Sequence, residues 1–162
     1  MEVKLKDNSE EILDKFEEAK FAALEAIGMK AEKYAKRELT NFPAVDTGRL
    51  RNSITHATVM DEGKEHKYTD KKGTEYTDTI GTGADEDAVY IGTNVEYGKW
   101  IELGTGIYAS DGQGKKEPWV YQDDEGEYHL TRGVRPVHFM KKAATEHSDE
   151  YKEINKRIFE NA

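Results

Sequence analysis

The tripeptide Asp46-Thr47-Gly48 is the one in which aspartic proteases carry their catalytic carboxyl group. In those enzymes two aspartates share one proton, so the pKa of one carboxyl must be raised. Here Arg49 follows, and a neighbouring cation lowers the pKa of a carboxyl. The alternative is structural: Asp46 or Thr47 caps a helical turn through Asn52, and Gly48 permits the bend. A lone tripeptide is a weak motif, so an aspartic-protease-like hydrolase using Asp46 stays an alternative hypothesis.

The remaining polar residues match no pattern of a metal or phosphate site. No two of the five histidines lie three or four residues apart, the spacing that places two ligands on one helix face. The acidic runs 85–87 and 123–125 lack the twelve-residue ligand spacing of a calcium loop. The glycine pairs of 81–83 and 104–106 are not followed by the Lys-Ser/Thr of a phosphate loop, and the chain has no cysteine. We therefore predict no metal, no cofactor, no catalytic residue and no enzyme activity.

Length and composition indicate a single, thinly cored domain over 1–162. Leu, Ile, Val and Phe together make up about 18% of the 162 residues, close to the level of about 20% below which charged chains tend to be disordered. The nine tyrosines, five phenylalanines and two tryptophans compensate in part, because each ring buries a large apolar area.

The charge distribution argues against nucleic-acid binding. Of the net charge of −9, residues 41–134 contribute −8, and binding to a phosphate backbone needs a basic face. We predict no sequence-specific nucleic-acid partner. No apolar run approaches the roughly 20 residues of a membrane span, and residues 1–6 lack a signal-peptide core, so we expect a protein made and assembled in the cytoplasm and no membrane partner.

Hydrophobic periodicity predicts a helix at each end of the chain. Over 8–40 the apolar residues recur at steps of three and four, Asn8 with Glu11 suits a capping box, and Gly28 marks a bend or close packing. A second amphipathic helix is predicted over 136–159. The order of helix, β-rich part and helix predicts an α+β fold, with the C-terminal helix on one face of an antiparallel meander.

The β-rich part spans 49–134. Strands are predicted within 50–60 and over 88–93, the latter as the central strand, and a short helix within 94–103. Two hairpins are predicted, one over 66–80 around a turn at 70–73 and one over 119–130 around an acidic turn. Because these hairpins are polar, we expect them to project, and we expect residues 61–87 and 107–117 to be mobile in the free monomer.

Three ordered blocks of the sequence resemble a known family. The segment 42–54 is similar to a Pro-x-Asp-Thr-Gly-x-Leu-x-x-Ser-Ile signature, 89–106 to a central block, and 135–144 to an Arg-Pro-Phe-x-x-x-Ala helix entry. Together they resemble the bacteriophage tail-completion, or head-tail joining, family. The residues that carry this structural motif are Asp46, Thr47, Gly48, Arg49, Leu50, Ser53, Gly92, Tyr97, Trp100, Glu102, Gly104, Thr105, Gly106, Arg135 and Pro136.

The resemblance implies a structural, non-enzymatic virion protein at the neck of a long-tailed phage or prophage. It would self-associate into a ring, contact the head connector or adaptor protein on one side, and contact the tail tube or tail terminator protein on the other. DNA would pass through the lumen. A separate hypothesis from charge is that acidic residues 85–87 face this lumen and keep the phosphate backbone from sticking; the alternative is that they form a solvated acidic loop. An acidic adaptor that binds a basic partner is a further alternative, which predicts an affinity that falls sharply with salt.

The resemblance also assigns structural roles. Arg49 and Glu102 would pair, tying the turn after the first helix to the loop 104–106, and Tyr97 with Trp100 would pack beneath that loop. Partner contacts are expected on the projecting hairpins, whose strand edges can pair with neighbours, and on the loop 107–116. The candidate contact residues are Tyr68, Tyr76, Trp119, Tyr121 and Tyr128.

Overall fold

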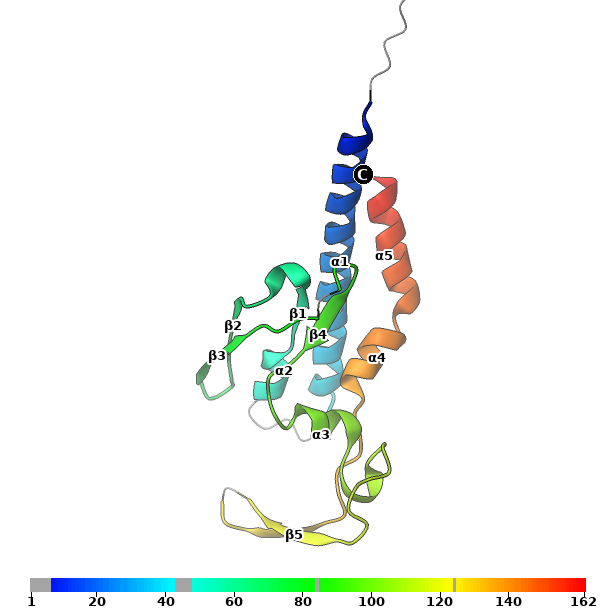
Figure 1. Ribbon diagram of the computed structural model, residues 1–162. Coiled ribbons are helices and arrows are strands. Elements are labelled where there is room, and N and C mark those ends of the chain that lie inside the picture. The colour runs from blue at the N-terminus through cyan, green and yellow to red at the C-terminus, as the bar shows by residue number, and fades with distance from the viewer. Residues whose placement is uncertain (1–6, 43–47, 84, 124) are drawn as a thin grey trace, which may run out of the picture.

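A single long helix, α1 (Ser9–Thr40), forms the spine of the molecule (Figure 1). The computed structural model describes residues 7–42, 48–83, 85–123 and 125–162. Strands β1 and β4 pack against α1, and helices α4 and α5 pack along it, so this helix is the element that the others share. The predicted helix over 8–40 and the predicted α+β class are both confirmed.

The other elements are short helices and short strands. In chain order they are α2 (Arg49–Ser53), β1 (Thr55–Thr58), the 3-10 helix η1 (Val59–Asp61), β2 (Glu65–Thr69), β3 (Glu75–Thr79), β4 (Val89–Gly92), α3 (Gly98–Leu103), the 3-10 helix η2 (Gly106–Tyr108), β5 (Trp119–Gln122), β6 (Tyr128–Thr131), α4 (Phe139–Thr145) and α5 (Ser148–Glu160). The predicted short helix within 94–103 is therefore confirmed as α3.

The strands form three separate two-stranded antiparallel sheets, β1 with β4, β2 with β3, and β5 with β6. Both predicted hairpins are confirmed. The expectation that 88–93 is a central strand is wrong, because β4 pairs with β1 alone within the described residues and is only half-buried. β1 and β4 are each four residues long, and the strands between them in the sequence, β2 and β3, pair with each other away from α1. No third described strand therefore joins β1 and β4 in a continuous meander.

The segment predicted as a strand over 50–60 begins as a helix instead. Gly48 takes a left-handed conformation with φ of +70°, which turns the chain directly into α2, and Asn52 N–H donates to the Gly48 carbonyl over 3.0 Å. The structural alternative correctly predicted a helical turn through Asn52 and a bend at Gly48. The N-cap position, however, is occupied by Gly48 itself. Asp46 and Thr47 lie outside the described residues.

Two details of the terminal helices differ from expectation. The Asn8 and Glu11 capping box does not form; instead, Asp7 Oδ1 accepts hydrogen bonds from the backbone and hydroxyl of Ser9. The helix predicted over 136–159 is two helices, separated between α4 and α5, and Pro136 does not begin it. It begins at Phe139 because His138 adopts a left-handed conformation with φ of 55°, which interrupts the helix there.

The core lies where α1 meets α2 and α4. Its buried members are Ala35, Leu39, Leu50, Ile54, Val95, Phe139 and Ala143. Phe139 is its largest fully buried side chain, and Leu39 and Ile54 are buried equally well. This core cluster thus lies at the C-terminal end of α1, whereas Leu13 and Phe16, near the start of α1, are exposed.

Gly28 permits close packing of the β1–β4 sheet on α1. A Cβ atom at this position would lie 2.6 Å from Cδ2 of His56 and 2.7 Å from Cγ2 of Val89, closer than such contacts occur. The helix continues through Gly28 without a break. Of the two predicted roles, bend or close packing, the second is correct.

Substitution Gly28→Ala tests this contact. Alanine would stabilise an exposed helix interior by about 1 kcal/mol, but overpacking here is expected to lower the free energy of unfolding by about 1 to 3 kcal/mol. Urea denaturation measures the difference. Gly81→Ala is the matched control, because its Cβ would meet nothing within 4 Å, and a Gly28→Ala chain as stable as wild type would contradict the packing.

A charged cluster joins β1 to α1 above this contact. His56 Nδ1 lies 2.5 Å from Oε2 of Glu32, and His56 Nε2 lies 3.0 Å from Oε1 of Glu25. The hydrogen bond to Glu32 raises the pKa of His56 to about 9, against the opposing effect of burial. Burial alone would raise the pKa of Glu32, but hydrogen bonds from His56 and Lys36 outweigh it and lower that pKa to about 2.

These shifts predict a pH window for stability. A raised histidine pKa stabilises the fold fully below its ordinary value of 6.5, and this contribution is lost as the pH rises through about 9. The Glu32 contribution is present above 4.5 and is lost as the pH falls through about 2. The stability excess of wild type over His56→Gln is therefore expected to be larger at pH 6 than at pH 10 in urea denaturation. An excess that does not depend on pH would refute the assignment.

Candidate functional site

The first two sequence blocks meet between α2 and the segment after β4. The Ser53 hydroxyl lies 2.5 Å from the hydroxyl of Thr93, and it also donates to the Leu50 carbonyl over 2.8 Å. A Cβ on Gly98 would lie 3.0 Å from Cδ1 of Leu50, so α3 packs directly on α2. The motif residues Leu50 and Ser53 are both buried.

The second and third blocks meet along their backbones. Thr105 N–H donates to the Val134 carbonyl over 2.9 Å, and Val134 N–H donates to the Thr105 hydroxyl over 2.9 Å. Ile107 N–H donates to the Arg132 carbonyl over 3.0 Å. Gly104 has φ of +77°, and a Cβ there would lie 2.9 Å from the Val134 carbonyl oxygen, so the approach requires glycine. We call this contact between 104–107 and 132–134 the glycine junction.

Glu102 holds the start of α4 against the end of α3. Its Oε2 accepts a hydrogen bond from Met140 N–H over 2.9 Å, and its Oε1 accepts one from Lys141 N–H over 3.1 Å. The Ile101 and Glu102 carbonyls accept from Val137 and His138 N–H. Glu102 therefore serves as a cap for α4, whose own N-cap residue makes no side-chain cap.

Arg49 and Glu102 were predicted to pair with each other, but the contacts given by the structure for each of them are with other residues. The Arg49 guanidinium lies over the ring of Tyr76, 4.5 Å from its centroid. The Tyr68 hydroxyl raises the pKa of the Arg49 guanidinium above its ordinary value. Arg49 thus fixes the β2–β3 hairpin to α2, where Asn52 also donates to the Thr69 carbonyl over 2.7 Å.

Replacement of Glu102 by alanine tests its capping role. Loss of both acceptors at the N-terminus of α4 is expected to lower the free energy of unfolding by about 1 to 2 kcal/mol. Thermal unfolding followed by circular dichroism measures the change. Glu96→Ala, an exposed carboxylate just before α3, is the matched control and should differ little from wild type. Equal stability of the two variants would show that the hydrogen bonds of Glu102 contribute nothing.

The aromatic side chains of the central block point outward rather than beneath the loop 104–106. Tyr97 is 42% exposed and Trp100 is 51% exposed, so the expectation that both pack under the loop is wrong. The reason is that Pro136 and Val134 already occupy the space beside Gly104. We call the open hollow that these rings border the α3 groove. Its volume is about 780 Å³, and its lining comprises Thr93, Asn94, Val95, Glu96, Tyr97, Gly98, Lys99, Trp100, Glu102, Phe139 and Met140.

The β5–β6 hairpin projects from the body at the end opposite the start of α1 and the C-terminus (Figure 1). Val120 lies opposite Leu130 in the register, and their side chains are 58% and 74% exposed. Tyr128 is 73% exposed, and Tyr121 is also exposed. The strand alternation places Val120, Tyr128 and Leu130 on one face. The candidate contact residues predicted from the sequence were all aromatic and did not include Val120 and Leu130, although the alternation of the strand pattern indicates them.

The other candidate contact residues are less accessible. Tyr68 is only 8% exposed, stacked between His66 and Tyr76. Trp119 is half-buried. A direct contact through Tyr68 is therefore excluded in this conformation, whereas contacts through Tyr121 and Tyr128 stay a prediction. Arg135, from the third block, lies over the ring of Tyr108 at 4.7 Å and joins η2 to the glycine junction.

A family comparison identifies the chain. The model of the family described as bacteriophage HK97-gp10, putative tail-component, matches residues 4–104, which is 101 of the 162 residues. The chain belongs to the HK97-gp10-like family. No curated protein and no solved structure matches it. As an HK97-gp10-like protein it is a structural component of the phage virion, which agrees with the family resemblance of its sequence blocks.

The part matched to the HK97-gp10-like family ends at the glycine junction. It includes α1, the β1–β4 sheet, the β2–β3 hairpin and α3, and it stops before the β5–β6 hairpin and α4. The α3 groove draws most of its lining from the matched part and takes Phe139 and Met140 from beyond it.

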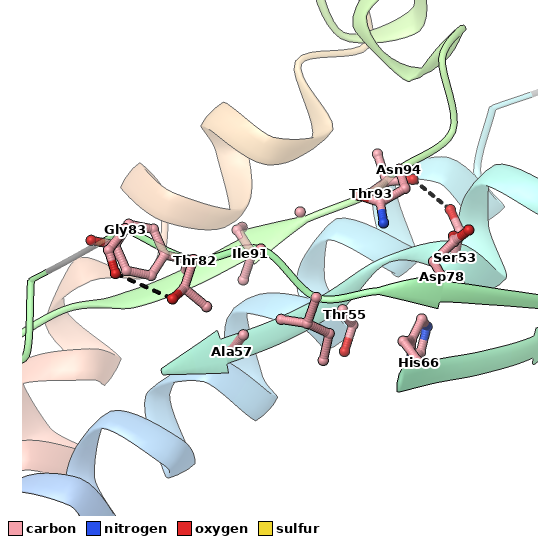
Figure 2. Close-up of a pocket in the computed structure, with 14 residues that line it drawn as sticks. Ser53, Thr55, Ala57, His66, Asp78, Thr82, Gly83, Ile91, Thr93 and Asn94 are labelled. Atoms are coloured by element: carbon pink, nitrogen blue, oxygen red, sulfur yellow. Dashed lines mark hydrogen bonds between the residues drawn. The ribbon is translucent and has the colours of Figure 1, made fainter. Parts of the chain in front are cut away.

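One further pocket of this HK97-gp10-like protein, of about 210 Å³, lies between β4 and the segment that follows β3. Figure 2 shows Ser53 and Thr93 at one end of it and Gly83 at the other. Ser53, His66 and Asp78 all line it, types that occur together in hydrolase triads. Here Ser53 is 1% exposed, and its hydroxyl donates a hydrogen bond to the Leu50 carbonyl, so this hydroxyl helps to fix α2.

The described ranges of this HK97-gp10-like chain contain no group of three or more acidic, histidine or cysteine side chains placed to hold a metal ion. Nor does any helix there have both the length and the apolar character needed to cross a bilayer.

Proposed function

We propose that this protein joins the phage head to the tail by assembling into a ring at the neck, and that it acts by binding alone. The observation that carries the proposal is a set of exposed apolar side chains on α3 and on the β5–β6 hairpin. Trp100 on α3 and Val120, Tyr128 and Leu130 on the β5–β6 hairpin are all more than half exposed. Monomeric proteins seldom leave such groups uncovered close together, and exposed apolar patches mark contacts with other proteins.

The rest of the structure supports a contact role. The β5–β6 hairpin has a free edge on each strand within the described residues, and such edges can pair with a strand of a neighbour. The glycine junction fixes the base of the hairpin to α3 and α4, so a neighbour bound at the hairpin would be held against the core. The proposed neighbours are the head connector or adaptor on one side and the tail tube or terminator on the other.

Deletion of the gene from the phage that carries it tests the proposal. We expect DNA-filled heads and complete tails that stay separate, because the missing piece acts only where they meet. Electron microscopy of lysates shows the particles directly. Addition of purified protein should restore joined, infectious phage, and deletion mutants that still yield joined particles would refute the neck position.

Asp46→Asn separates this proposal from the hydrolase alternative. Binding without catalysis predicts that the variant restores joining as well as wild type does. Loss of peptide cleavage at acidic pH by Asp46→Asn, in a chain that still assembles, would instead favour a hydrolase.

A further inference from the structure

We propose that the β5–β6 hairpin of one copy binds in the α3 groove of a second copy. The apolar face of the hairpin consists of Val120, Tyr128 and Leu130, and its own chain leaves all three largely uncovered. The α3 groove offers the complementary surface, since Tyr97 and Trp100 border it and Phe139 with Met140 lie at its base. This inference rests on the proposed ring assembly and specifies the surfaces that form it.

Charge favours contact of the hairpin with the α3 groove over contact with a second hairpin. The turn of the hairpin carries Asp123, Glu125 and Glu127, so two hairpins face to face would bring like charges together. Of the three, Asp123 forms an ion pair, with His129 at 2.7 Å. The groove lining holds Lys99, whose ammonium rests 4.5 Å from the centre of the Trp100 ring, together with the carboxylates Glu96 and Glu102. With the exposed Lys141 beside it, the groove is close to neutral, so it repels the acidic turn less than a second hairpin would. Glu102 in the groove does not oppose an acidic partner fully, because α4 N–H groups bind both of its oxygens.

The two surfaces belong to different parts of the chain, so the contact is head-to-tail. A surface that meets a different surface on the next copy leaves one of each free, and repetition closes into a ring when the rotation permits. Figure 1 shows α3 between the α1 body and the β5–β6 hairpin, so both surfaces lie in the half of the molecule away from the start of α1. A hairpin-to-hairpin contact would stop at a dimer.

A mixing experiment with two variants tests this arrangement. The hairpin variant carries Val120→Ser and Leu130→Ser, and the groove variant carries Trp100→Ser. All three side chains are more than half exposed, so both variants are expected to fold. Met29→Ser, at an equally exposed position on α1, is the matched control and should assemble as wild type does.

Sedimentation velocity, with protein concentration raised until wild type associates, gives the outcome. Each variant alone is expected to lose self-association by at least about tenfold in Kd. An equimolar mixture is expected to form dimers and nothing larger, because each pair retains one intact hairpin and one intact groove. A mixture that stays monomeric, or variants that assemble like wild type, would overturn the inference, as would wild type that never associates.

The head-tail joining assay separates failure of this inference from failure of the proposed function. If the hairpin variant and the groove variant both restore joined phage, the inference is wrong and the neck role stands. If wild type itself fails to restore joining, the proposed function is wrong whatever the mixing experiment shows.

Discussion

The glycine junction is the constraint on which the lower half of the molecule depends. Two backbone segments about thirty residues apart in the chain approach so closely at Gly104 and Gly106 that no side chain fits between them. This approach aligns α3 with α4, and Glu102 then completes the hydrogen bonding of the first turn of α4. Phe139 is the first residue of that turn and is buried in the core, so the largest buried side chain owes its position to the same contact.

The part of the molecule around the β1–β4 sheet is stabilised differently, by close packing of small residues, because the chain has few large apolar residues. Helix α1 buries mostly alanines, which contribute little area each but let neighbouring elements approach closely. Gly28 extends that principle to the β1–β4 sheet, and the cluster of His56 with Glu32 and Glu25 adds charge-assisted hydrogen bonds along the same contact. Close packing of small residues thereby gives a folded core in a chain that has few large aliphatic residues.

Much of the fold could be predicted because its signals are local. The periodicity of α1, the turns of both hairpins and the short α3 helix are written in neighbouring residues. The break before Phe139 could not be predicted, since the left-handed conformation of His138 is imposed by the contacts of Val137 and His138 with α3. The same holds for the sites: the glycines of 104–106 are visible in the sequence, but their partner at 132–134 is not. Burial of Tyr68 and exposure of Trp100 likewise depend on which neighbours the fold supplies.

The attachment of the β5–β6 hairpin resembles a cantilever. Strand β6 ends at Thr131, and residues 132–134 directly after it belong to the glycine junction. The hairpin, which acts as the arm, is therefore fixed at its base by this junction, which acts as the clamp, while its strands project from the body. A small change in the backbone angles at the clamp would be amplified into a large displacement of the acidic tip. Because the clamp also abuts Pro136 and the first turn of α4, strain felt at the tip would be transmitted to the core through backbone atoms rather than through mobile side chains.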